Sequence, residues 1–281
     1  MAGLGFNMLP NDSVSTILSL TSPPDVCRSS LVSSTFRSAA DSYVVWERFL
    51  PSDYWDIVSR SVTPLKFSSK HELFFCLCNP ILIDGGNKSF TLEKSTGKKS
   101  YILSARELSI TWGDEPTNWS WKYIPESRFS EVAVLKTISQ LEVQGKIKTQ
   151  MLSQNTTYGA YLIVKVSDGA YGLDSIPSEI SIEVGNHVST NTAYLQRVDH
   201  KKQQMECLFY MNRSQMLKMR VNQGVNKVLR EREDGWMEIE LGEFFSAEGD
   251  EEVKMSLMEV KGHHLKGGLI IEGIEVRHKH K

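Results

Sequence analysis

The residues of this chain that could perform catalysis are few and poorly spaced for it. Hydrolysis of a glycosidic bond, for example, needs two carboxylates that face each other across the bond. Asp114 and Glu115 are adjacent, so their side chains diverge on a strand or loop, and no second acid can be assigned to either. The sequence contains no G-x-S-x-G elbow, no P-loop and no H-E-x-x-H motif. We therefore expect a non-catalytic protein that needs no cofactor.

The cysteines do not predict a metal site. Cys76 and Cys78 form a C-x-C pair without the second well-spaced Cys or His pair that a tetrahedral zinc site needs. Cys27 and Cys207 also lie among apolar neighbours. We interpret all four as buried structural thiols.

Composition and charge narrow the class of partner. The chain has 281 residues, of which 40% are hydrophobic and 23% charged, enough for one or two cores. Its 32 basic and 34 acidic residues are mixed along the sequence, so no long-range field attracts nucleic acid or an anionic membrane. The N-terminal segment lacks the features of a signal peptide, and no stretch approaches the roughly 20 apolar residues of a membrane span. We expect a cytoplasmic and/or nuclear protein.

The first fifty residues have the pattern of short amphipathic helices. Apolar residues recur at helical spacing in two stretches: Val14, Ile17, Leu18 and Val32, Phe36, Ala39. Pro10 is tolerated in the opening turn of the first helix, because its missing N–H would have no partner there. After the Ser22-Pro23-Pro24 break, Asp25 is expected to cap a second helix that carries Val26.

Residues 1–50 resemble the F-box family, which holds substrate receptors onto the Skp-type adaptor, and through it the cullin, of SCF ubiquitin ligases. In that family the matching positions form an apolar surface that interlocks with the adaptor's helices. The resemblance implies the following adaptor-binding residues: Leu9, Pro10, Ile17, Leu18, Val26, Leu31, Val32, Phe36 and Trp46. Asn11 stands where family members more often carry an acidic residue, which weakens an end charge and leaves the apolar anchors in place.

Residues 51–100 are expected to connect this module to the C-terminal domain and to pack on that domain. Asp84-Gly85-Gly86-Asn87 predicts a turn, and KSFTLEKSTGKKSYIL predicts a hairpin that turns at Ser95-Thr96-Gly97. From Tyr101 onward the hydrophobic period changes from 3.6 to 2, which marks the change from helices to strands.

The chain from residue 101 to residue 281 reads as half-buried strands separated by turns. Apolar and polar residues alternate in SEVAVLKTISQLEV and EEVKMSLMEV. Further strand candidates are SARELSITW, TYGAYLIVKVSD, SEISIEV, MECLFYM and GWMEIELGEFF. Their spacing is typical of an antiparallel β-sandwich. We therefore predict a mainly β protein with a small α-helical N-terminal module.

Two positions in the β region carry more specific predictions. Trp236 follows an Asp-Gly turn inside a strand pattern, so we assign it to core packing. In GLIIEGIEVRH the apolar set changes parity, from Leu269 and Ile271 to Ile274. Gly273 stands at the change, where a β-bulge would reverse the side-chain alternation.

The C-terminal region is similar to the phloem protein 2-like domain, also found in the jasmonate-induced tobacco lectin. The similarity lies in SARELSITWGDEPTNWSWK, in DGWMEIELGEFF and in VKMSLMEVKGHHLKGGLIIEGIEVR. Proteins that join an F-box to this domain form a plant family, so the two resemblances support each other. The lectin domain implied in this way spans residues 101–281.

The second resemblance implies carbohydrate binding without a metal. The family's lectins are β-sandwiches that bind N-acetylglucosamine oligomers and N-glycan cores, and Trp112 and Trp119 match tryptophans implicated in that binding. A flat indole can cover the C–H face of a pyranose while polar groups bind its hydroxyls. The implied sugar-binding residues are Trp112, Trp119, Asp114, Glu115 and Asn118. Trp121 would share a face with Trp119 on an extended strand, so one of the two can instead close the core.

Two functions agree with these patterns. The chain is either a ubiquitin-ligase receptor whose β-domain binds glycosylated targets, or the same receptor with a β-domain that binds protein surfaces and has lost the sugar site. They differ in whether Trp112 and Trp119 are exposed around a concave, partly polar surface. A working lectin requires an exposed Trp119, whereas Trp112, next to the strand-like LSIT, is expected to be the more buried of the two.

Overall fold

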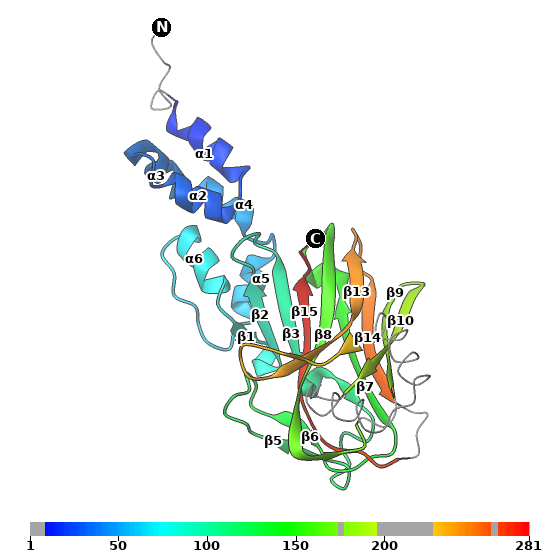
Figure 1. The fold of residues 1–281 in the computed structure, drawn as a ribbon. Helices are drawn as coiled ribbons and strands as arrows, with labels where there is room; N and C mark the ends of the chain where they lie inside the picture. The colour runs from blue at the N-terminus through cyan, green and yellow to red at the C-terminus, as the bar shows by residue number, and fades with distance from the viewer. Residues whose placement is uncertain (1–8, 174–176, 196–226, 260–263, 281) are drawn as a thin grey trace, which may run out of the picture. The chain divides into compact units, whose positions relative to one another are not determined.

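The computed structural model describes residues 9–173, 177–195, 227–259 and 264–280. The chain forms two compact units, which span residues 1–101 and 102–281 and are called unit 1 and unit 2. Unit 1 is mainly helical, and unit 2 is made of sheets that are antiparallel except for the short β10–β11 pair (Figure 1). The fold class predicted from the sequence is confirmed.

Unit 1 begins with four short helices and continues with two more helices and three strands. The helices are α1 (Asn11–Ser19), α2 (Pro23–Ser29), α3 (Ser34–Ala40), α4 (Tyr43–Phe49), α5 (Tyr54–Ser59) and α6 (Lys70–Leu77). The strands β1 (Ile81–Ile83), β2 (Lys88–Leu92) and β3 (Lys99–Ser104) lie side by side in that order. The predicted turn is the 3₁₀ helix η2 (Asp84–Gly86), and the predicted hairpin is β2–β3, so both are confirmed.

Serine side chains cap the N-terminal ends of three of these helices. Ser22 caps α2 by accepting a hydrogen bond from the backbone N–H of Asp25, and Ser33 and Ser69 cap α3 and α6 in the same way. The expectation that Asp25 is the cap was therefore wrong. Pro23 is already the first helical residue, which its fixed φ allows, so Asp25 lies in the first turn, where its charge suits the helix dipole.

Trp46 organises the core of unit 1. Its Nε1 donates to the carbonyl oxygen of Ala40 at 2.6 Å, and its ring lies against Phe49 of α4. Three rings of α6 also surround it at centroid distances between 4.4 and 5.6 Å: His71, Phe74 and Phe75. Helix α6 therefore completes a core that the first four helices are too short to close by themselves.

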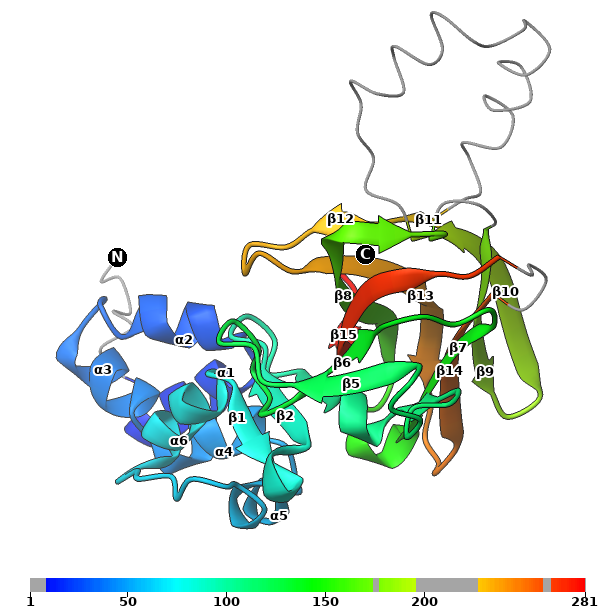
Figure 2. The same cartoon turned by 90° about the horizontal axis from the view of Figure 1, so that it is seen from below.

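Unit 2 consists of two stacked sheets (Figure 2). One sheet has the order β15-β8-β13-β12, with β6 also paired to β15 and β5 paired to β6; the other has the order β11-β10-β9-β14-β7-β4. Their bounds are β4 (Ser109–Ile110), β5 (Trp119–Lys122), β6 (Val132–Leu135), β7 (Leu141–Lys148), β8 (Thr156–Tyr171), β9 (Ser178–Val184), β10 (His187–Tyr194), β11 (Lys227–Val228), β12 (Arg230–Glu231), β13 (Met237–Ser246), β14 (Glu252–Glu259) and β15 (Gly267–His278).

The predicted β-bulge in β15 is confirmed. The register between β15 and β8 shifts between Ile271 and Gly273, and Leu269, Ile271 and Ile274 are all fully buried. A Cβ at position 273 would lie 2.0 Å from the carbonyl oxygen of Leu103, so only glycine fits there.

Most strand candidates form strands, with two exceptions. SARELSITW contains the 3₁₀ helix η3 (Ala105–Glu107) and only the two-residue strand β4, because the chain turns before it extends. MECLFYM, with Cys207, lies outside the described residues. Of the other cysteines only Cys78 is buried; Cys27 is exposed on α2 and Cys76 is half-buried, so the expectation of uniform burial was wrong. No helix in the described ranges has the length and apolar character to cross a membrane.

Candidate functional site

The structure divides the predicted adaptor-binding residues into two groups. Leu18, Val26 and Trp46 are buried in the core of unit 1, where they hold the helices together. The second group offers its side chains to solvent: Leu9, Pro10, Ile17, Leu31 and Val32 are exposed, and Phe36 is half-buried. The buried residues can shape a docking surface, but in this conformation only the second group can contribute area to it.

Helix geometry explains the division within α1. Val14 and Leu18, four residues apart, share the face that packs on α3 and α4. Ile17 points about 100° away from Leu18, and 53% of its surface is exposed. The sequence pattern predicted the helix, but it could not show which of the two residues, Ile17 or Leu18, faces solvent.

Three exposed apolar residues of the same module were missed by sequence reasoning: Leu20, Tyr43 and Val44. Leu20 lies three residues after Ile17, a spacing that places it on the same side of the chain's first helix. Tyr43 and Val44 open α4, directly before the buried pair Val45 and Trp46. We call these three residues, together with the exposed group above, the docking surface.

In unit 2 the candidate site is built around the turn that connects β4 to β5. Trp112 adopts a left-handed conformation with φ of 57°, which is uncommon for a residue other than glycine. Its carbonyl oxygen accepts the N–H of Glu115, and the carbonyl of Glu115 accepts the N–H groups of Asn118 and Trp119. This tight turn presents the Trp112 side chain to solvent, and 61% of its surface is exposed.

The indoles of Trp119 and Trp121 in β5 donate hydrogen bonds to the backbone of this turn. Nε1 of Trp119 donates to the carbonyl of Thr111 at 3.0 Å, and Nε1 of Trp121 donates to the carbonyl of Gly113 at 3.1 Å. The guanidinium of Arg106 lies 3.6 Å from the centre of the Trp121 ring. The backbone on both sides of Trp112 is therefore anchored, which fixes the position from which the exposed indole extends.

The expected burial of the two tryptophans is reversed. Trp119 is only 2% exposed, so it has no free face for a sugar, whereas Trp112 is the exposed residue. The physical reason is the pairing of β5 with β6, which directs Trp119 opposite Leu135 and into the core. The core position proposed for one of Trp119 and Trp121 belongs to Trp119. Trp236 is fully buried, which confirms its assignment to packing.

Beside Trp112 lies a pocket with a volume of about 390 Å³. Its lining comes from three segments: Trp112, Glu115, Asn118, Thr137, Ile138, Ser139 and Leu265. Three of the five predicted sugar-binding residues, Trp112, Glu115 and Asn118, are thus brought together. Asp114 is exposed but does not line the pocket. The pocket has one indole, two aliphatic side chains and several hydrogen-bonding groups, the mixture expected of a small-ligand site.

The remaining lining was missed because it is distant in sequence. Thr137, Ile138 and Ser139 belong to the connection between β6 and β7, and Leu265 lies two residues before the start of β15. Nothing in the local pattern KTIS distinguishes it from any other connection between strands. A backbone bridge between Ile138 and Lys266 brings these two segments together.

The walls of the pocket are held by polar contacts. Nδ2 of Asn118 donates to the carbonyl of Thr137 at 2.9 Å, and Nζ of Lys136 donates to the carbonyl of Pro116 at 2.7 Å. Lys266 is almost completely buried, forms an ion pair with Glu259 at 2.6 Å and donates to the carbonyl of Ser139 at 2.7 Å. These contacts join all three lining segments, so we expect the pocket to be largely formed before a ligand binds.

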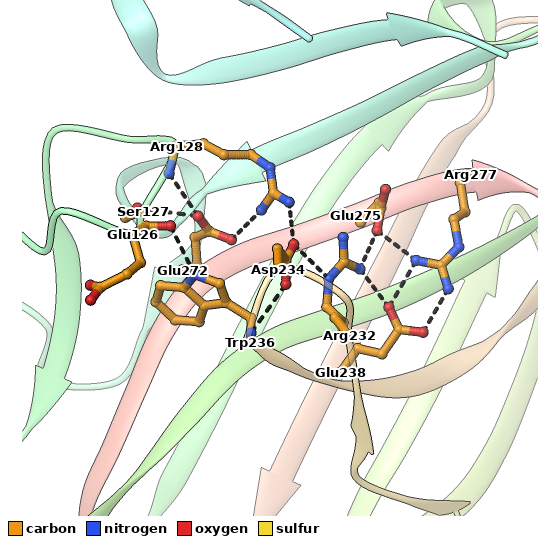
Figure 3. Close-up of polar contacts among 10 residues, drawn as sticks. All are labelled: Glu126, Ser127, Arg128, Arg232, Asp234, Trp236, Glu238, Glu272, Glu275 and Arg277. Atoms are coloured by element: carbon orange, nitrogen blue, oxygen red, sulfur yellow. Dashed lines mark hydrogen bonds and ion pairs between the residues drawn. The ribbon is translucent and has the colours of Figure 1, made fainter. Parts of the chain in front are cut away.

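A second cluster of charges in unit 2 has a structural role. Arg232 and Arg277 both pair with Glu238 and Glu275, and Arg128 pairs with Asp234 and, at 2.6 Å, with Glu272 (Figure 3). Every charged group in this set therefore already has an opposite charge within the protein.

Glu272 of this cluster binds Ser127 and Arg128, in the segment that follows β5 in the chain. Ser127 and the N–H of Arg128 donate to Glu272, and the carbonyl of Glu126 accepts Nε1 of the buried Trp236 at 3.1 Å (Figure 3). Burial raises the pKa of Glu272 despite the opposing hydrogen bonds and positive charge of Arg128. These contacts tie the segment to the buried Trp236, so the cluster is explained by its structural role.

The comparisons with known proteins agree with both halves of the chain. Residues 98–278 match the phloem protein 2 family, and residues 6–48 match the F-box domain. The chain is 55% identical to "F-box protein PP2-B15" of Arabidopsis thaliana, an alignment that covers 97% of this chain and 96% of that protein. It is 52% identical to "F-box protein VBF" of the same plant, covering 97% of this chain and 99% of that protein.

Proposed function

The chain belongs to the F-box proteins with a phloem protein 2 domain, and from this membership we propose that it selects glycosylated targets for an SCF-type ubiquitin ligase through the Trp112 pocket. Its F-box domain indicates binding to a Skp-type adaptor, and its role is that of a substrate-recognition subunit rather than a catalyst. The docking surface supports binding to the adaptor. The pocket supports recognition of a glycosylated target.

The observation that carries the glycan proposal is the exposed indole of Trp112 at the edge of a pocket with polar walls. An indole held in a strained left-handed turn gains nothing for folding by being exposed, and such strain is often found where a ligand binds. The open face of Trp112 can stack on one pyranose ring, and Glu115, Asn118 and Ser139 lie close enough to line the same ligand. With Trp119 in the core, the site offers one stacking surface rather than two.

The test is a sugar titration on the full chain with N-acetylglucosamine oligomers as the probe. Trp112→Ala should weaken binding about tenfold, or ~1.4 kcal/mol, because one stacking contact is lost. Tyr123→Ala is the matched control, since Tyr123 is exposed in unit 2 but does not line the pocket. Absence of binding by the unchanged protein at millimolar ligand would refute the glycan proposal.

That outcome would favour the second candidate function, in which the same pocket binds a protein surface. Leu265 and Trp112, which are both more than half exposed, supply apolar area that suits a peptide side chain as well as a sugar. The two candidates share the docking surface, so adaptor binding does not separate them. A glycosylated target that still binds after enzymatic removal of its glycans would identify the protein-surface function.

A further inference from the structure

Unit 1 exposes a tryptophan beyond the end of the F-box match at residue 48. Trp55 is the second residue of α5, and 59% of its surface is exposed, whereas Tyr54 and Ile57 of the same helix are buried. Trp46, the other tryptophan of this unit, lies in the core. Single exposed aromatic residues are common on protein surfaces, so the surroundings of Trp55 decide its significance.

The Trp55 ring contacts two side chains of unit 1, Lys70 and Phe67. Nζ of Lys70 lies 5.1 Å from the centre of the Trp55 ring and 3.7 Å from that of Tyr54, and it pairs with Glu47 at 3.0 Å. The Lys70 side chain is only 12% exposed, so the surrounding groups restrict its movement. Phe67 lies beside the indole with a centroid distance of 6.1 Å. Trp55 is therefore positioned in advance, which lowers the entropy cost of using it in an interface.

The same ammonium connects Trp55 to the docking surface. Lys70 lies 5.5 Å from the ring centre of Tyr43, the exposed first residue of α4, which belongs to the F-box match. Tyr43 and Trp55 are thus neighbours across one buried cation, although α5 follows the matched domain in sequence. Through Tyr43, the docking surface therefore lies next to Trp55 of α5.

We propose that Trp55 is a contact for the Skp-type adaptor and extends the docking surface past the F-box itself. The inference builds on the adaptor docking of the proposed function. Specific interfaces bury about 800 Å² on each partner, and their largest energetic contributions usually come from Trp, Tyr and Arg. Apart from Tyr43, the exposed apolar side chains described in helices α1 to α4 are aliphatic. Trp55 adds a largely exposed tryptophan to a surface whose other aromatic side chains are Tyr43 and the half-buried Phe36.

The experiment measures adaptor affinity of the full chain by calorimetry with a purified plant Skp-type adaptor. Trp55→Ala should raise the dissociation constant about tenfold or more, and Trp55→Phe should lose less, because it keeps a flat ring. The matched control is Tyr123→Ala, which removes an exposed aromatic residue of unit 2 and should leave affinity unchanged. Because Trp55 is exposed, its variants should melt within about 2 °C of the original chain.

Ile17→Asp, which places a charge in the docking surface, distinguishes adaptor binding by that surface from the additional contact proposed for Trp55. If Ile17→Asp abolishes adaptor binding and Trp55→Ala binds like the original chain, the extension to α5 is wrong and the docking surface stands. If the original chain does not bind the adaptor, both proposals fail. If Trp55→Ala disrupts self-association in light scattering without changing adaptor affinity, the occupant of this surface is a second copy of the chain, and the proposal is overturned.

Discussion

Trp119→Ala should lower the stability of unit 2 strongly, and it should remove no direct contact with a ligand. The indole is 2% exposed and donates to the carbonyl of Thr111, so the substitution creates a cavity and leaves that carbonyl without its partner. Truncation of a buried tryptophan costs about 3 to 5 kcal/mol. For a domain of this size, 1 kcal/mol lowers the melting temperature by roughly 2 to 4 °C, so a loss of about 6 to 20 °C is expected.

Trp112→Ala provides the opposite result in the same assay. Because its side chain is largely exposed, the melting temperature should stay within about 2 °C, while sugar affinity falls about tenfold. Differential scanning calorimetry and a sugar titration on both variants measure the two quantities. A Trp119→Ala protein that melts normally but has lost sugar binding would refute the assignment of this indole to the core.

Three further predictions concern other parts of the chain. Ile17→Asp should abolish adaptor binding at an unchanged melting temperature, whereas Leu18→Ala should lose about 2 to 5 kcal/mol of stability, as thermal melts and calorimetry would show. Gly273→Ala should lower the melting temperature of unit 2 by several degrees, because its Cβ would meet a backbone carbonyl at 2.0 Å; an unchanged melt would contradict the bulge geometry. Hydrogen bonds from Arg60, with the charges of Arg60 and Lys88, hold the pKa of Asp84 at about 2 rather than 3.8, so this contribution to stability is present above about pH 4 and is lost as pH falls toward 2. The stability difference between the original chain and Asp84→Asn should therefore shrink over that interval in denaturant titrations, and a constant difference would rule out the ion pair as its cause.

The sequence was informative wherever a residue type has one structural use. The parity change at Gly273 could be predicted because only a bulge moves apolar residues to the other side of a strand, and the structure confirms it. The burial of Trp236 followed from its place in a strand pattern after an Asp-Gly turn. The segments that line the pocket could not be found in this way, because Ile138 and Leu265 meet only through strand pairing between distant parts of the chain.

The reversal of Trp112 and Trp119 shows why a shared motif does not assign the same role to each of its members. The turn between β4 and β5 exposes the indole of Trp112 to solvent, whereas the buried indole of Trp119 donates a hydrogen bond that anchors the turn. In the segment WSWK the polar neighbours of Trp119 and Trp121 do not distinguish an inward strand from an outward one. The decision comes from β6, whose Val132 and Leu135 are buried and pair directly with the two ends of β5. A substitution at either tryptophan is therefore expected to weaken the proposed ligand binding, and only the accompanying change in stability would tell which of them touches the ligand.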